Sequence, residues 1–136
     1  KLLIAISFLF LVGIPFANAE QVYYCSPEFS YGVVYKESKG AYVTANFKKE
    51  RLTLKFKENF TKLDGVNEYM GTWNCHKPFD HLPFEIICHD RRKSGNVLAF
   101  NLENYRYLIS NTTTSGYPSD DKQGTNTMLG GTCEKF

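Results

Sequence analysis

Candidate chemistry is concentrated in one stretch of the sequence, CHKPFDHLPFEIICHD, which spans residues 75–90. This stretch holds two cysteines, three histidines and two aspartates. Histidine and cysteine are common ligands of zinc, and a histidine near a carboxylate can act as a general acid or base. These side chains could therefore serve a hydrolase or a metal-dependent enzyme. The candidate residues are His76, His81, His89, Asp80 and Asp90.

The spacing of these residues does not match a known catalytic pattern. It contains neither the HExxH motif of zinc proteases nor a CxxC pair, and the chain has no GxSxG elbow or glycine-rich phosphate loop. In a strand over residues 84–89, Cys88 would share the inward face with Ile86, and His89 would point to the opposite face. We therefore expect a hairpin closed by a disulfide, without a catalytic residue, a metal site or a cofactor. The enzyme is the alternative hypothesis.

The first residues have the order of a secretory signal peptide. Lys1 is followed by the apolar run LLIAISFLFLVGIPF and by the small-x-small triplet ANA at residues 17–19, a typical cleavage site. The run is shorter than the roughly 18 apolar residues that a membrane-spanning helix needs. We expect residues 1–19 to be removed, leaving residues 20–136 as a single domain without a transmembrane segment. Its expected location is periplasmic or secreted.

All four cysteines lie in the predicted mature domain, and an exported chain with an even number of cysteines is expected to form disulfides. Four cysteines allow three pairings, which the sequence alone does not distinguish. We favour a bond between Cys75 and Cys88, because they flank a proline-containing loop. The remaining pair, Cys25 with Cys133, would join the two ends of the domain. Cysteines in disulfides cannot bind a metal as thiolates, which weakens the metal hypothesis.

Alternation of apolar and polar residues predicts an all-β domain. In RLTLKFKE, residues 51–58, the side chains of Leu52, Leu54 and Phe56 share one face, as in a half-buried strand. Short turns separate similar runs, which favours antiparallel neighbours. We expect a small antiparallel β-barrel or sandwich of about eight strands, stapled by two disulfides. The expected strands cover residues 22–25, 29–36, 41–47, 51–58, 68–75, 84–89, 97–101, 104–110 and 126–133.

Two regions are candidates for binding. Arg51, Lys55 and Lys57 lie on the polar face of the strand just described, where they could bind an anionic surface or could only protect an exposed strand from unwanted pairing. The polar segment of residues 111–125 is too long for a tight hairpin and carries Tyr117. The formal net charge of the chain is +2, so no general attraction to nucleic acid is implied.

An apolar leader, a short β domain and a disulfide between Cys25 and Cys133 are together similar in outline to small exported inhibitor domains of bacteria, including the periplasmic inhibitors of lysozyme. This resemblance implies a protein partner and assigns no role to individual residues. We expect a monomeric, non-catalytic binding or inhibitor-like module for an extracytoplasmic protein or an anionic glycan. A carrier of a small apolar ligand inside a barrel is a further alternative.

Overall fold

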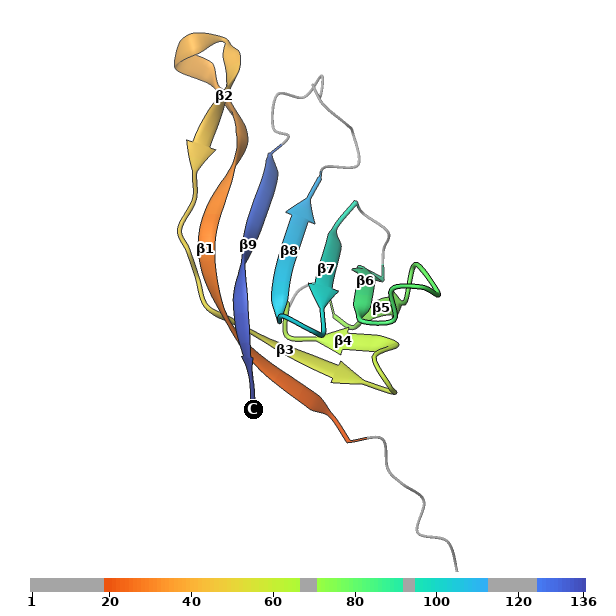
Figure 1. The fold of residues 1–136 in the computed structure, drawn as a ribbon. Coiled ribbons are helices and arrows are strands. Elements are labelled where there is room, and N and C mark those ends of the chain that lie inside the picture. Colours follow the sequence, from red (N-terminus) through yellow and green to blue (C-terminus); the bar gives the residue numbers. More distant parts are fainter. Residues whose placement is uncertain (1–18, 67–70, 92–94, 113–124) are drawn as a thin grey trace, which may run out of the picture.

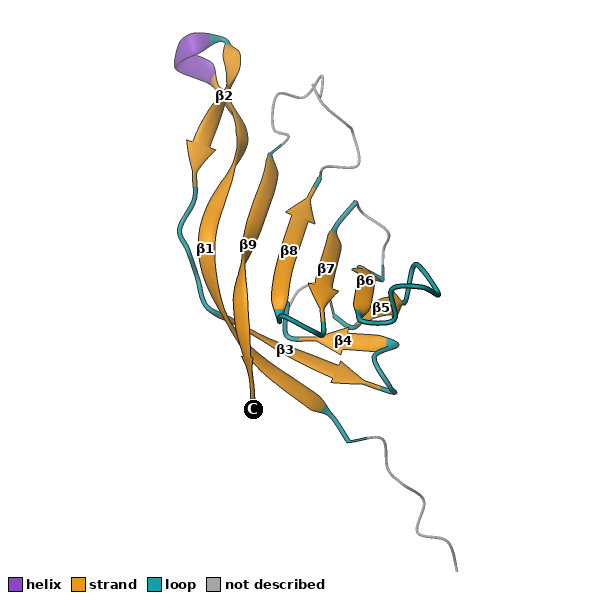
Figure 2. Ribbon diagram, in the orientation of Figure 1, coloured by secondary structure: helices purple, strands orange, loops and turns teal. Residues whose placement is uncertain are grey.

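The structure, a computed structural model, describes residues 19–66, 71–91, 95–112 and 125–136. These residues form nine strands and one short 3-10 turn (Figures 1 and 2). The elements are β1 (Gln21–Lys36), the turn (Glu37–Lys39), β2 (Ala41–Asn46), β3 (Leu52–Lys57), β4 (Lys62–Asp64), β5 (Trp73–His76), β6 (Glu85–His89), β7 (Val97–Asn101), β8 (Arg106–Asn111) and β9 (Asn126–Lys135). No helix in the described part of the chain is long and apolar enough to cross a membrane.

The strands form a closed antiparallel barrel with one strand added outside the closure. The sheet runs β2-β1-β3-β4-β5-β6-β7-β8-β9, and β9 pairs back onto β1. The expectation of an all-β fold is confirmed, and of the two architectures left open the structure is the barrel. Closure is possible because β1 is long: its first part pairs with β3, its second part with β2, and β9 runs along its other edge. β2 and the end of β1 project beyond the barrel (Figure 1).

Three strand predictions differ from the structure. The strand expected over residues 68–75 is observed only as β5, Trp73–His76, because Gly71 has a positive φ of 64° that strands do not use, and residues 67–70 lie outside the described part of the chain. The expected strands over residues 22–25 and 29–36 are one strand, β1, because the chain passes Pro27 in a β-bulge instead of a turn. This bulge shifts the register with β9 between Pro27 and Phe29. The short strand β4 was not predicted, since three residues are too few to show an alternating pattern.

The inward-facing side chains form an aromatic core. The rings of Tyr23, Phe56 and Phe100 contact one another, with centroids 4.9 to 5.8 Å apart. Trp73 is fully buried beside them, and no described residue hydrogen-bonds to its Nε1. Tyr107 is also buried and its hydroxyl lacks a described partner; burial, with the nearby Glu28 carboxylate, raises its pKa to about 12. The rings occupy the space in which a carried ligand would have to lie.

Both disulfides connect directly opposed residues of neighbouring strands. Cys25 on β1 is bonded to Cys133 on β9, and Cys75 on β5 is bonded to Cys88 on β6. This is the pairing favoured from the sequence, and no described cysteine is free. All four cysteines are part of the buried core. The disulfides therefore lock the closure of the barrel at β1–β9 and the hairpin on its far side.

Gly131 allows β1 and β9 to approach closely at the bulge. A Cβ atom at this position would lie 2.1 Å from the carbonyl oxygen of Ser26, closer than real Cβ atoms approach a backbone oxygen. The neighbouring Gly130 is covered by the ring of Phe29, to which a Cβ atom would come within 2.5 Å. The pair Gly130-Gly131 thus has a structural role in the seam that closes the barrel.

Candidate functional site

The stretch of residues 75–90, with its cysteines, histidines and aspartates, contains a disulfide-stapled hairpin. Cys75 and Cys88 point into the core, and the alternation of the strands turns His76 and His89 outward. The two imidazole rings are stacked almost parallel, with centroids 5.7 Å apart and planes 8° from parallel. His81 lies in the connection between β5 and β6, where its ring contacts Phe79. Stacked rings do not direct their nitrogen atoms toward one common ligand.

Of the two aspartates of this stretch, Asp90 lines a depression of about 410 Å³ together with His76 and His89, whereas Asp80 is not part of its lining. Asp90 is buried, with an exposed fraction of 2%, and accepts a 2.7 Å hydrogen bond from the Asn96 side-chain amide. The backbone of Asp90 also donates to the carbonyl of Asn96, so this carboxylate organises the turn between β6 and β7. Asp80 is exposed in the connection before β6. Over the described residues, no group of three or more metal-binding side chains converges.

The predicted basic row is exposed, but part of its charge is neutralised. The Nζ of Lys57 donates a 2.7 Å hydrogen bond to Asp64 on β4 and lies 3.5 Å from a carboxylate oxygen of Glu20. The bond to Asp64 raises the pKa of Lys57, and the same bond holds the pKa of Asp64 below its usual value. Lys55 on β3 and Arg51, which directly precedes β3, are both exposed, as expected.

Arg51 lines a shallow depression of about 380 Å³ where β3, β1 and β9 meet. Tyr24, which is half exposed, and Glu134 line the same depression. The guanidinium therefore faces a mixed surface and not a continuation of the lysine row. The other predicted binding residue, Tyr117, lies outside the described residues, as do residues 113–124 around it.

The structure reveals a surface that sequence reasoning missed. On the outside of β1, β9, β8, β7 and β6, where an antiparallel sheet facing water usually carries polar residues, apolar side chains lie next to one another. We call this surface the outer apolar face. Its members are Phe29, Tyr31, Met128, Leu108, Ala99, Val97 and Ile87.

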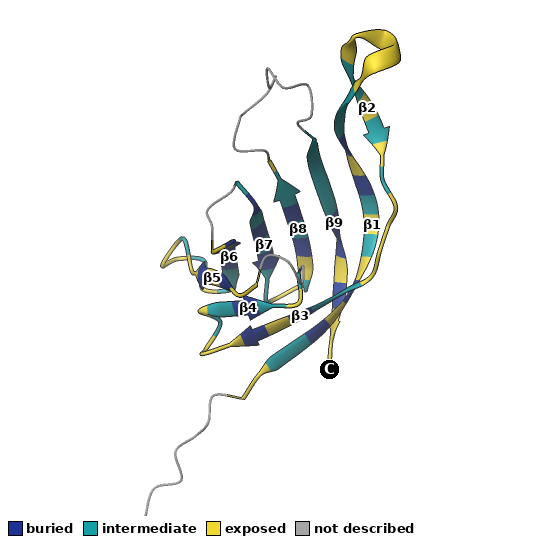
Figure 3. Ribbon diagram, turned by 180° about the vertical axis from the view of Figure 1, so that it is seen from behind, coloured by how far each residue is buried: buried dark blue, intermediate teal, exposed yellow. Residues whose placement is uncertain are grey.

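The strand register makes the outer apolar face continuous. One row of directly opposed residues runs from Phe29 across Gly130, Leu108 and Ala99 to Ile87. A second row contains Tyr31, Met128 and Val97, joined through Ser110. The rings of Phe29 and Tyr31 contact each other, with centroids 5.5 Å apart, and 47% of Tyr31 is exposed. The alternation of buried and more exposed residues along these strands is visible in Figure 3.

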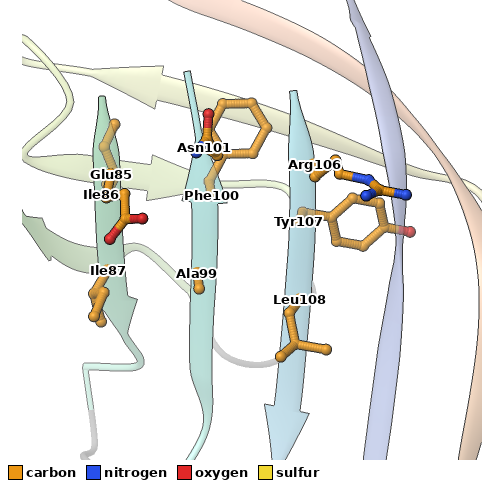
Figure 4. Close-up of a pocket in the computed structure, with 9 residues that line it drawn as sticks. All are labelled: Glu85, Ile86, Ile87, Ala99, Phe100, Asn101, Arg106, Tyr107 and Leu108. Carbon is orange, nitrogen blue, oxygen red and sulfur yellow. The ribbon is translucent and has the colours of Figure 1, made fainter. Parts of the chain in front are cut away.

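A depression of about 250 Å³ lies within this face (Figure 4). Its outward-facing apolar lining comes from three neighbouring strands and consists of Ile87, Ala99 and Leu108. Glu85, Asn101 and Arg106 lie along one side of it. Arg106 is well exposed, with a guanidinium nitrogen 3.9 Å from a carboxylate oxygen of Glu28. The site thus combines an apolar floor with one positive and one negative group at its edge.

The sequence contains a signal for this face. The strands concerned carry uninterrupted apolar runs, such as Val97-Leu98-Ala99-Phe100 and Tyr107-Leu108-Ile109, and not strict alternation. Such runs are typical of strands that are buried on both faces. In this barrel the second face has no covering layer among the described residues, so the runs mark a surface that another molecule could cover.

The chain folds into a closed antiparallel β-barrel that contains two disulfides and has one additional strand at its edge. No protein-family model, no curated protein and no solved structure matches this chain. A function therefore has to be inferred from the surfaces just described.

Proposed function

We propose that the protein is an exported, non-catalytic binding module that docks another protein through the outer apolar face. The observation that carries this proposal is the two-row set of apolar residues on the water-facing side of β1 and β6–β9. Exposed apolar patches with a polar rim are typical of protein-binding surfaces. The two disulfides support a periplasmic or secreted location, since such bonds persist in oxidising compartments.

The composition of the face favours a protein partner over a glycan. Aromatic residues, methionine and arginine are enriched at protein interfaces, and Phe29, Tyr31, Met128 and Arg106 belong to or border this surface. An apolar side chain of the partner would enter the depression, and an acidic group beside it would meet Arg106. An anionic glycan would instead need the basic row, where Asp64 already binds Lys57.

Site-specific photocrosslinking tests this proposal. A photoreactive residue at Leu108, in the floor of the depression, is expected to give one discrete adduct with a partner in the compartment that holds the protein. The same residue at Lys55, on the opposite side of the barrel, is the control and is expected to give none. Adducts from position 55 alone would contradict the proposal and favour the basic row.

The purified partner then allows a quantitative test. Ala99→Arg places a charge in the apolar floor and is expected to weaken the dissociation constant by at least about tenfold. Thr53→Arg, on the outside of β3, is the matched control and is expected to leave binding unchanged. Equal affinities for the two variants would rule out the outer apolar face as the binding surface.

A further inference from the structure

β2 presents a free strand edge outside the closed barrel. A closed barrel leaves no edges, yet within the described residues β2 pairs only with β1 and contributes nothing to closure. It pairs with β1 over six consecutive residues without a bulge. In Figures 1 and 2 no described element lies on the side of β2 away from β1. The projecting hairpin of β1 and β2 therefore presents a free strand edge, which closure removes from the barrel itself.

The register shows which backbone groups face the free edge. The backbone N–H of Phe47 donates to the carbonyl of Ser30 at 3.0 Å, so these two residues form a hydrogen-bonded pair. In an antiparallel ladder hydrogen-bonded pairs alternate with non-hydrogen-bonded pairs. Ala45 therefore faces β1, whereas Thr44 and Asn46 direct their N–H and C=O groups away from it. Both residues are exposed.

This edge lacks the usual protection against strand pairing. Natural edge strands carry lysine, proline or a bulge, or are covered by another element. The six residues of β2, AYVTAN, contain no charge and no proline. The lysines that follow are engaged within the chain: Lys48 forms a 2.8 Å ion pair with Glu50, and the Nζ of Lys49 donates to the carbonyl of Glu28.

We infer that β2 pairs antiparallel with β2 of a second copy of this chain, about a two-fold axis at Thr44. This arrangement places Thr44 opposite Thr44 of the second copy, in a hydrogen-bonded position, and Asn46 opposite Tyr42 of the second copy. Threonine pairs and uncharged neighbours are favourable across strands, and no like charges within β2 oppose each other. An interface of this kind is isologous and closed, so it makes a dimer and not a fibre.

Because of the orientation of β2, the dimer interface lies beside the outer apolar face. Thr44 is opposite Val33 and Asn46 is opposite Tyr31 in the β1–β2 register, so these side chains lie on the face that carries Tyr31. Pairing at β2 would therefore place the outer apolar faces of the two copies side by side in one sheet. The pairing itself does not depend on the partner protein proposed above.

The oligomeric state of the purified protein tests the inference. Sedimentation velocity over a range of concentrations is expected to show a monomer–dimer equilibrium. Thr44→Pro removes an outward N–H that the barrel does not use, and proline is tolerated in edge strands at such positions. It is expected to weaken dimerisation at least about tenfold, which corresponds to about 1.4 kcal/mol. Thr44→Val, which retains the N–H, is the matched control.

Disulfide trapping provides a second readout that does not depend on the proline variant folding well. Thr44→Cys places two thiols across the two-fold axis within disulfide range and is expected to give covalent dimers on mild oxidation. Ser38→Cys, at the exposed tip of the same hairpin, is the control and is expected to remain monomeric. A monomer at all concentrations would overturn the inference. So would a dimer that Thr44→Pro leaves intact and Leu108→Lys disrupts, which would place the interface on the outer apolar face.

Discussion

The outside of the barrel has two unlike halves, although one row of opposed residues runs around both. On β1, β9 and β7 this row contains Tyr31, Met128 and Val97. On β4 and β3 it contains Lys62 and Lys57, and here the side chains pair with each other: Lys57 with Asp64, and Lys62 with Asn74 at 2.7 Å.

The inward residues of the two halves do not differ in this way. Trp73, Leu63 and Phe56 on the polar half are as deeply buried as Leu98 and Phe100 on the apolar half. Core packing therefore does not explain the difference between the two outer surfaces. The polar half satisfies its own side chains, whereas the apolar half leaves a surface whose burial would be favourable. This difference is the reason for placing partner binding on β1 and β6–β9.

The largest expected effect is the loss of stability when one of the two disulfides is removed. Replacing Cys25 and Cys133 by alanine is expected to cost on the order of 4 to 5 kcal/mol, because this bond closes a loop of 108 residues. Replacing Cys75 and Cys88, which close a loop of 13 residues, is expected to cost about 3 kcal/mol. Urea unfolding of the two double variants measures both values. A greater loss for the β5–β6 pair would contradict this order.

The next effect compares the loss of stability on truncating an inward-facing and an outward-facing leucine of the apolar half. Leu98→Ala on β7 removes a fully buried side chain and is expected to cost ~2 to 5 kcal/mol. Leu108→Ala on β8 changes the outer apolar face and is expected to cost less than about 1 kcal/mol, since the side chain is only half-buried. Thermal and urea unfolding give both differences. Equal losses would mean that Leu108 is covered within the monomer.

The smallest effect concerns the ion pair of the polar half. The pKa of Asp64 is lowered by its hydrogen bond from Lys57, so the stabilisation it contributes is present above pH ~4 and is lost as the pH falls through the lower folded-state pKa. Asp64→Asn is expected to reduce stability slightly at neutral pH and to have no effect at strongly acid pH. The free energy of unfolding, measured from about pH 2 to about pH 7, tests the direction of this change. Asp80→Asn is the exposed control.

The sequence predicted the parts of the fold that local patterns determine. Alternation in residues 51–58 identified β3 and its inward face. The proline-containing loop between Cys75 and Cys88, and the places of Cys25 and Cys133 at the two ends of the domain, favoured the disulfides that the structure shows. Barrel closure could not be predicted in this way, because it depends on the pairing of β1 with β9, which are far apart in the chain. The passage of β1 through Pro27 was missed because a bulge and a turn use the same residues.

The candidate site was harder to predict than the fold. Its residues come from five strands, and none of them is a titratable group with a recognisable spacing. The alternation that turns His89 outward in residues 84–89 also turns Ile87 outward, but its neighbours Ala99 and Leu108 are defined only by the register. Sequence reasoning therefore turned to charged residues and histidines, which the structure places in pairs and turns.

The Cys25–Cys133 bond also determines how the domain responds to mechanical force. The bond joins the first strand to the last, and the backbone of Phe136 is hydrogen-bonded to Val22 beside it. Tension applied between the two ends of the domain would pass through the covalent bond and not through the chain that it encloses between Cys25 and Cys133. Pulling would extend only the short segments outside the bond, and the barrel would stay folded under load until the disulfide was reduced.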